Sequence, residues 1–395
     1  MRTTIGPAAL LAVLLALGLG VGCAGSGGDG SSADGTVYAG LDRAGDYPVG
    51  VRTLDLVDES RPDDPYSRGP RFLKTEIWYP AAESARDAPP ASGTDWIPRA
   101  LAPLAPFLTI RGHHVFDFQT HAVRGADVAS GRFPLVVFSH GNQAVRYQSF
   151  TLCEHLASHG FVVASPDHIG NAAVAERADG SLALYADVFG VPALDRRIAD
   201  MRFVISTVFG MGAAGSGSFL AGAIDEARGV GITGHSFGGA TTVATAAVDS
   251  RIRSAAPMAA AVFEDRMPPL TVPSLTWIGG EDKTVGVEAN DAMRQISDAS
   301  APPRAFADLL DAGHFTFSDA CVLLPGFFGS DGCGEGTRIA DGSTFPFIGH
   351  DESWAILDAT TTALFLATLT DDASAGAFLR RNPARAEVEF TTSGW

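Results

Sequence analysis

The sequence predicts an α/β fold built on a doubly wound, mostly parallel β-sheet. Short apolar runs alternate with longer segments in which apolar residues recur at helical spacing, and the alternation continues from residue 133 to about residue 369. The apolar runs are continuous, as expected for strands that are covered by helices on both faces. The chain has 395 residues, a length that suits one large α/β domain or two smaller domains.

The expected elements follow one another in strand and helix order. The helix at residues 192–209 begins near Pro192, and the helix at residues 147–159 ends at Gly160. Further helices are expected after residue 233 through Val248, at 287–297 and at 352–369. Strands are expected at residues 71–79, 135–138, 161–165, 229–233, 254–258, 274–278 and 304–309.

Two segments interrupt the alternation, at residues 81–132 and 322–350, and both are rich in Pro, Gly, Phe and His. They are interpreted as loops that extend over one end of the sheet, either as covers of a substrate site or as plain surface loops. Because one strand and helix series runs through the rest of the chain, residues 45–395 are predicted to form a single domain.

Residues 1–22 are predicted to be a signal peptide. They carry one charge, Arg2, and an apolar run at residues 8–19 that is short for a membrane span. Cys23 follows at once, and residues 23–44 are expected to be a lipidated Cys and a flexible linker, because the arrangement resembles a bacterial lipoprotein signal. We expect an exported protein, held by a lipid on Cys23 to a membrane in the periplasm or at the cell surface. The alternatives are an ordinary cleaved signal, which gives a secreted protein, and an uncleaved anchor.

An exported chain folds in an oxidising compartment, where cysteines pair. Cys321 and Cys333 flank a short loop and are predicted to form a disulfide, which would contribute roughly 3 kcal/mol by restricting the unfolded chain. Cys153 lies on the apolar side of an expected helix and is predicted to be a buried free thiol.

Charge and motif content exclude several classes of partner. Lys and Arg number 28 and Asp and Glu number 45, so the net charge of −17 argues against nucleic acid binding. No cofactor is expected, because the Gly-rich segment at 210–215 follows a helix and not the strand of a dinucleotide site. No metal is expected, because His113 and His114 are adjacent and lack the spacing of helical ligands. The protein is expected to be a monomer.

The segment Gly234-His235-Ser236-Phe237-Gly238 has the G-x-S-x-G pattern of a catalytic serine. In a chain with 45 Gly the pattern alone is weak evidence. Its setting strengthens it, because an apolar strand precedes it and a helix follows it, as in a nucleophile elbow. Such a turn places the hydroxyl at a helix N-terminus, where N–H groups stabilise negative charge. Ser236 is therefore the predicted nucleophile.

A serine hydroxyl needs a neutral His to take its proton and a carboxylate to orient that His. Only His314 and His350 follow Ser236 in the chain. His314 comes just after an expected strand, at the edge where the elbow lies, whereas His350 falls within a loop segment. His314 is the predicted base.

Asp282 is the predicted acid, because it follows an expected strand at the same edge of the sheet. The competing carboxylates are Asp265, Glu281 and Asp311. Asp311 lies so near His314 in sequence that a role in a turn suits it better.

A tetrahedral intermediate needs two backbone N–H donors for its oxyanion. Phe237, directly after the nucleophile, supplies one in the elbow arrangement. The other is expected after the strand at residues 135–138, where Asn142 is the candidate. His140 and His235 are expected to pack beside the site without taking part.

Several stretches together resemble the α/β-hydrolase superfamily, and more narrowly the platelet-activating factor acetylhydrolase and dienelactone-hydrolase-like esterases. They are Ser139-His140-Gly141, residues 165–171, residues 234–239 and residues 312–319. The resemblance implies metal-free hydrolysis of carboxylic esters, often with short acyl chains, through a serine acyl-enzyme. In the platelet-activating factor enzymes the acid follows the strand after the elbow helix, where this chain has Ala259. The acid would then be Asp282, as in the dienelactone-hydrolase-like and cutinase-like esterases.

The sequence thus predicts a serine esterase that acts on a small-molecule or lipid-like ester, with short acyl groups expected. The alternatives are a secreted polyester or lipid hydrolase of the same fold and a non-catalytic surface lipoprotein that binds a ligand. Ser236, Asp282 and His314 argue against the last alternative, because binding alone does not need these three residues together.

Overall fold

The computed structural model describes residues 39–110, 112–324, 327–381 and 386–395. The predicted signal peptide, Cys23 and most of the predicted linker lie outside the described residues. No helix in the described part of the chain combines the length and the apolar character needed to cross a bilayer.

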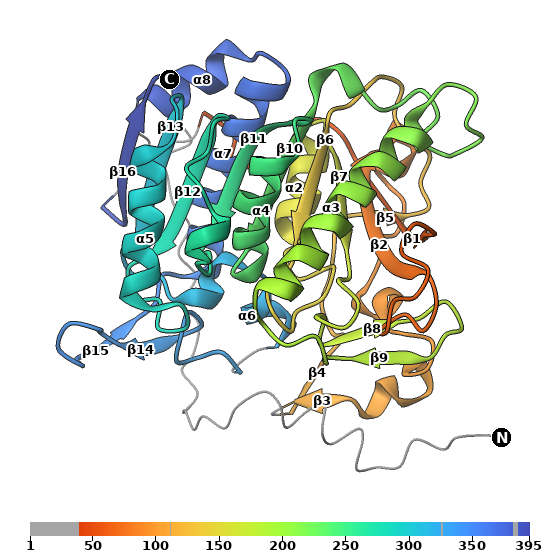
Figure 1. Ribbon diagram of the computed structural model, residues 1–395, viewed down its shortest axis with the longest axis horizontal. Coiled ribbons are helices and arrows are strands. Elements are labelled where there is room, and N and C mark those ends of the chain that lie inside the picture. The colour runs from red at the N-terminus through yellow and green to blue at the C-terminus, as the bar shows by residue number, and fades with distance from the viewer. Residues whose placement is uncertain (1–38, 111, 325–326, 382–385) are drawn as a thin grey trace.

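Ten strands of the described residues form one mixed sheet, in the order β16-β13-β12-β11-β10-β6-β7-β2-β1-β5 (Figure 1). The strands from β13 to β7 are parallel, and antiparallel pairs occur between β7 and β2, β2 and β1, and β13 and β16. The predicted fold class is therefore confirmed. The strands are β1 (Val49–Asp58), β2 (Arg71–Pro80), β5 (Val123–Arg124), β6 (Leu135–Ser139), β7 (Val162–Pro166), β10 (Val230–His235), β11 (Ile252–Met258), β12 (Ser274–Gly279), β13 (Arg304–Leu309) and β16 (Val388–Ser393).

Helices cover both faces of the sheet, and a separate apolar core lies on each face. Helices α3 (Val191–Gly212), α4 (Phe237–Val248) and α5 (Gly286–Ala299) lie in front of the sheet in Figure 1. Helices α2 (Phe150–Ser158) and α7 (His350–Leu369) lie behind it, and α8 (Ala373–Arg380) follows α7. Successive residues of a strand face opposite sides, so Val136 packs in the rear core while Val137 packs in the front core.

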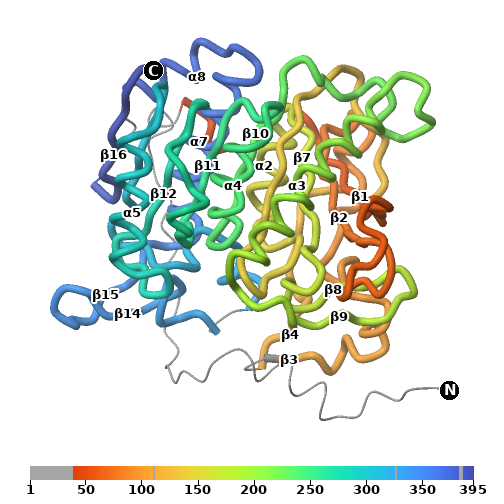
Figure 2. The backbone as a smooth tube through the Cα atoms, in the orientation of Figure 1, coloured from red at the N-terminus to blue at the C-terminus, as the bar shows by residue number. Residues whose placement is uncertain are grey.

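The two loop segments form short elements that gather at one edge of the sheet (Figures 1 and 2). This edge lies at the carboxyl ends of the parallel strands, where the predicted site residues also lie. The short elements at this edge are η2 (Gly93–Trp96), η3 (Ala102–Phe107), β3 (Thr109–Ile110), β4 (His113–His114), β8 (Val174–Glu176), β9 (Leu182–Leu184), α6 (Ala320–Leu323), β14 (Glu335–Thr337) and β15 (Thr344–Pro346). In contrast, η1 (Glu83–Ala85) follows β2 at the opposite edge, because β2 ends beside the start of β7.

Several elements differ from those expected. Helix α3 continues through Gly212 instead of ending at Phe209. A Cβ on Gly212 would lie 2.5 Å from the side chain of Ile224, so this glycine permits close packing and does not mark a flexible loop. His350 is the first residue of α7 and does not lie within a loop. Strand β16 and helix α8 were not expected.

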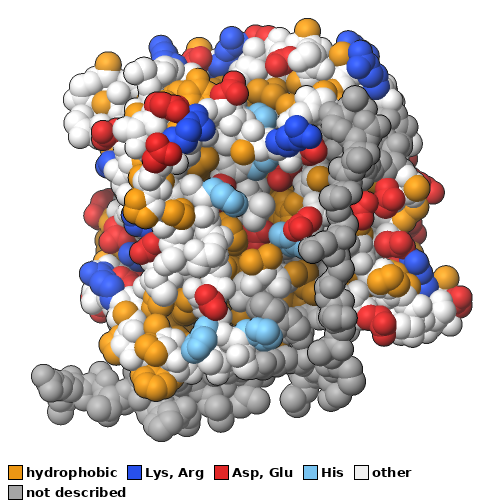
Figure 3. Space-filling model, turned by 180° about the vertical axis from the view of Figure 1, so that it is seen from behind, with side chains coloured by type: hydrophobic (Ala, Val, Ile, Leu, Met, Phe, Trp, Pro, Cys, Tyr) orange, Lys and Arg blue, Asp and Glu red, His pale blue; other side chains and the backbone are white. Residues whose placement is uncertain are grey.

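Acidic side chains are spread over the rear face of the molecule, and Lys and Arg occur there in a few separate places (Figure 3). This distribution agrees with the net charge of −17 of the chain.

Helix α2 carries a buried histidine whose protonation opposes folding. His155 exposes 8% of its surface, and its Nε2 lies 3.0 Å from the carbonyl oxygen of Leu41. Burial lowers the pKa of His155 to about 3, because the charged imidazole is poorly solvated there. In the unfolded chain the pKa of a histidine is about 6.5, so between these two values the unfolded chain binds more protons than the folded protein does.

The free energy of unfolding is therefore expected to fall as the pH drops below about 6.5, by about 1.4 kcal/mol per pH unit for His155 alone. The variant His155→Gln should lose this part of the pH dependence. Urea unfolding of both proteins at several pH values between about 4.5 and 7.5 tests the expectation. Parallel pH profiles for the two proteins would contradict it.

Candidate active site

Ser236 occupies the turn between β10 and α4, in a backbone conformation that non-glycine residues rarely adopt. Its φ is 61° and its ψ is −119°. The turn is fixed by backbone hydrogen bonds, because the N–H of Ser236 donates to the Met258 carbonyl at 2.9 Å and its own carbonyl accepts from Ala240 at 3.1 Å. A strained conformation held in this way is typical of functional turns. The hydroxyl of Ser236 stands at the N-terminus of α4.

The glycines around Ser236 are required by close backbone contacts. A Cβ on Gly238 would lie 1.8 Å from the Ser139 carbonyl oxygen, and a Cβ on Gly234 would lie 2.5 Å from the Gly238 oxygen. Such distances leave no space for a side chain. The G-x-S-x-G pattern therefore follows from the packing of α4 against the end of β6.

Asp282 and His314 form a buried hydrogen-bonded pair at the same edge of the sheet. The Asp282 Oδ2 atom lies 2.7 Å from the His314 Nδ1 atom. The other oxygen, Oδ1, accepts from the N–H groups of Thr284 at 2.9 Å and Val285 at 3.0 Å, which fixes the carboxylate. With Nδ1–H directed at Asp282, the Nε2 atom of His314 carries a lone pair and can accept a proton.

A chain of buried hydrogen bonds joins this histidine to the elbow. The Nε2 of His235 donates to the His314 carbonyl oxygen at 2.9 Å, and the two imidazole rings are 4.6 Å apart at their centroids. The Gln148 side chain completes the chain: its Nε2 donates to His235 Nδ1 at 2.7 Å, and its Oε1 accepts from the Gly141 N–H at 2.6 Å. Burial lowers the pKa of His235 far below its usual value, so this residue is neutral and accepts and donates one hydrogen bond each.

Asp331 joins the loop of the base to the loop of the acid. Its Oδ1 accepts from the His314 N–H at 3.0 Å and from the Lys283 N–H at 3.2 Å. Its Oδ2 accepts from the Thr284 hydroxyl at 2.6 Å. No sequence motif marks Asp331, and its role depends on a contact between segments far apart in the chain.

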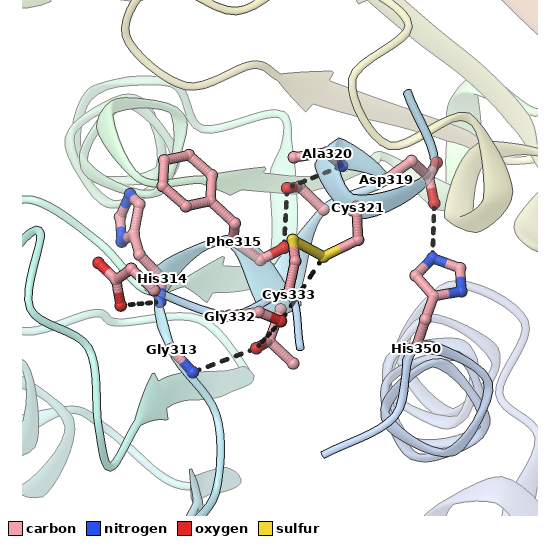
Figure 4. The surroundings of a disulfide bond; sticks show 12 residues. Gly313, His314, Phe315, Asp319, Ala320, Cys321, Gly332, Cys333 and His350 are labelled. Carbon is pink, nitrogen blue, oxygen red and sulfur yellow. Dashed lines mark hydrogen bonds and ion pairs between the residues drawn. A yellow bond between two sulfur atoms is a disulfide. The ribbon is translucent and has the colours of Figure 1, made fainter. Parts of the chain in front are cut away.

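The predicted disulfide between Cys321 and Cys333 is present, and Cys153 is a buried free cysteine. The bond lies close to the residues that follow His314 (Figure 4). Cys333 stands two residues after Asp331, so the disulfide attaches the segment of Asp331 to helix α6.

Asp265 is exposed in η5 (Glu264–Arg266), and the remaining candidates for acid and base have other partners. Asp311 and Glu281 both pair with Arg338. His350 Nε2 lies 3.4 Å from Asp319 Oδ1, on the far side of the disulfide from His314 in Figure 4. Burial lowers the pKa of His350, but the interactions with Asp319 and Asp351 together outweigh it, and the pKa is raised.

The two predicted oxyanion donors lie beside the nucleophile. Phe237 follows Ser236 in the turn, and Gly141, next to Asn142, is so close that its Cβ would lie 3.4 Å from the Ser236 Cβ. Within the described part of the chain, neither the Asn142 N–H nor the Phe237 N–H donates a hydrogen bond to another residue. Both amides are therefore available for an oxyanion.

Aromatic side chains lie next to the elbow. The rings of Phe189 and Phe263 contact the Phe237 ring, with centroids 4.7 Å and 5.4 Å away. Phe189 exposes 43% of its surface although it is apolar. The apolar surface near Ser236 is suited to contact an uncharged part of a ligand.

Two family models match adjoining parts of the chain. Residues 43–179 match the model described as platelet-activating factor acetylhydrolase, isoform II, and residues 193–328 match the model described as PET hydrolase-like. Among solved structures, the chain is similar to a ferulic acid esterase from Streptomyces cinnamoneus, with 27% sequence identity and a TM-score of 0.68 over 88% of this chain and 97% of that chain. Together with the fold, these matches show a carboxylic ester hydrolase with the α/β-hydrolase fold.

The variant Gly238→Ala is expected to be destabilised by roughly 1–3 kcal/mol or more, because its methyl group would overlap the Ser139 carbonyl oxygen. The matched control is Gly210→Ala on helix α3, where a Cβ has no atom within 4 Å. Urea unfolding should show the control unchanged or stabilised by about 0.5–1 kcal/mol. Equal stability of Gly238→Ala and the wild type would show that the close contact is not a constraint.

Proposed function

We propose that this ester hydrolase works as a serine esterase, with Ser236 as nucleophile, His314 as base and Asp282 as the acid that orients it. One observation carries the proposal. The strained Ser236 at the start of α4 and the Asp282–His314 pair, 2.7 Å apart, stand at the same edge of the sheet, joined through His235. A histidine oriented by a carboxylate activates a serine hydroxyl when its Nε2 atom accepts the hydrogen bond of that hydroxyl, and this is the role proposed for His314 toward Ser236.

In the proposed reaction, the Ser236 oxygen attacks the ester carbonyl carbon while His314 Nε2 takes the hydroxyl proton. The negative charge formed on the carbonyl oxygen is held by the N–H groups of Phe237 and Asn142. The bond to the alcohol then breaks, and His314 returns its proton to the leaving oxygen. Water attacks the acyl-enzyme by the same route, which releases the acid and restores Ser236.

We propose esters with short acyl groups as substrates, and polyesters are the second candidate. The polyester candidate is favoured by the match of residues 193–328, which include Ser236, Asp282 and His314, to a PET hydrolase-like model. The partly exposed Phe189 beside the elbow supports it too, because an open aromatic surface suits a polymer chain.

A fluorophosphonate probe is expected to label the wild type and not Ser236→Ala, while Ser216→Ala, which changes an exposed serine, is labelled like the wild type.

His314→Ala should lower kcat by at least about 1000-fold, with His350→Ala as its matched control. Rates over p-nitrophenyl esters of increasing acyl length, and on a soluble terephthalate diester, distinguish the two substrate classes. Absence of labelling in the wild type would favour a ligand-binding protein instead.

We further propose that the protein is exported as a lipoprotein anchored through Cys23, on the basis of its N-terminal sequence. The full chain expressed in a bacterium should then partition into the detergent phase of Triton X-114. Cys23→Ser should remain in the aqueous phase, whereas Cys153→Ser, a change at a buried cysteine, should partition like the wild type. Aqueous partitioning of the wild type would exclude the lipid anchor.

A further inference from the structure

Arg197 of helix α3 contacts the loop that carries Asn142. It is 1% exposed. Its guanidinium donates to the His140 carbonyl at 2.6 Å and to the Gly141 carbonyl at 3.0 Å. One planar group therefore holds two successive carbonyls of the turn after β6.

Arg197 and His140 together fix the direction of an amide, because the Gly141 carbonyl accepts from Arg197 at 3.0 Å and from His140 Nδ1 at 2.7 Å. The Gly141 carbonyl and the Asn142 N–H belong to the same trans peptide group, so they point in opposite directions. Because the carbonyl points to Arg197, the N–H points away from Arg197. We propose that Arg197 is a positioning residue of the oxyanion site, which aims the Asn142 N–H and supports it with a fixed positive charge. This inference rests on the proposed esterase function.

The charge of Arg197 has no carboxylate partner. Of the other buried arginines, Arg71 pairs with Asp200 and Arg146 with Asp167, whereas Arg177, at 9% exposure, bonds to carbonyl and hydroxyl oxygens. In the described part of the chain, no carboxylate lies within ion-pair distance of Arg197, and its bonds go to neutral acceptors. Burial lowers the pKa of Arg197 to about 9, which leaves the group charged at neutral pH. An unpaired buried cation is costly to folding, and a developing oxyanion is a charge that it can stabilise.

Arg197 also contacts the second oxyanion donor. Its guanidinium carbon lies 4.5 Å from the centroid of the Phe237 ring, within the range of a cation–π contact. Asn171 completes the support: its Oδ1 accepts from Arg197 Nη2 at 2.5 Å, and its Nδ2 donates to Asn142 Oδ1 at 3.0 Å. Both residues of the proposed oxyanion site are therefore in contact with Arg197, directly or through Asn171.

The test compares two variants with the wild type. Arg197→Lys keeps a charge but lacks the planar fork whose two nitrogens bond the two carbonyls. Asn171→Asp gives the charge of Arg197 a carboxylate partner and also removes the hydrogen bond to Asn142 Oδ1. For both we expect kcat on p-nitrophenyl acetate to fall about 10- to 100-fold, with KM changed less than about threefold, because the donor itself remains. The inhibition constant of an alkyl boronic acid, which forms a tetrahedral adduct on serine, should rise by the factor by which kcat/KM falls.

Arg71→Lys is the matched control, because Arg71 is equally buried and contacts the same helix through Asp200, but has no bond to the turn after β6. It should lower the unfolding temperature and leave kcat and boronate binding within about twofold of the wild type. If Arg197→Lys does not fold, the kcat and the boronic acid inhibition constant of Asn171→Asp test the inference.

Wild-type kcat in the folded variants, or an equal loss in Arg71→Lys, would overturn the inference while the esterase function stands. A wild type without esterase activity or probe labelling would overturn the proposed function itself.

Discussion

The proposed site depends on one contact between two backbone segments at the centre of the sheet. Strands β6 and β10 are parallel neighbours with Ser139 opposite Gly234, which brings the first turn of α4 against the Ser139 carbonyl. The close contact between α4 and the end of β6 is possible because Gly234 and Gly238 have no side chains. The same contact places the turn after β6 beside Ser236, so the nucleophile and both proposed oxyanion donors are positioned by a single packing arrangement.

Two neutral buried side chains, Gln148 and His235, connect the turn after β6 to the loop of His314 by hydrogen bonds. Together they form a chain of hydrogen bonds that starts at the Gly141 N–H and ends on the backbone carbonyl of His314. Protonation of His235 would leave two donors facing each other at Gln148, which the buried position disfavours. The site is therefore held by hydrogen bonds whose directions are fixed, and fixed geometry is what stabilisation of a transition state requires.

The residues that were predicted from sequence share one property: each follows a strand of the parallel sheet. Ser236, Asp282 and His314 come after β10, β12 and β13, and parallel strands bring their carboxyl ends to one edge. Whether they perform the assigned roles is still a prediction. Gln148, Asp331 and Arg197 were not found in this way, because they lie on a turn, a loop and a helix whose contacts are set by tertiary packing. Strand β16 was missed because it pairs only at the outer edge, with polar residues on its exposed side.

The disulfide between Cys321 and Cys333 holds a part of the site by a covalent bond that can be reduced, whereas no disulfide holds the sheet in the described part of the chain. The strands and helices are held by two apolar cores, whereas the segment of Asp331 is attached to α6 through Cys333. Reduction of this one bond would leave the sheet intact and release the covalent attachment of the carboxylate that joins the loops of His314 and Asp282. The segment that contacts the proposed base is thus held by a covalent bond as well as by hydrogen bonds, and that bond persists only in an oxidising compartment.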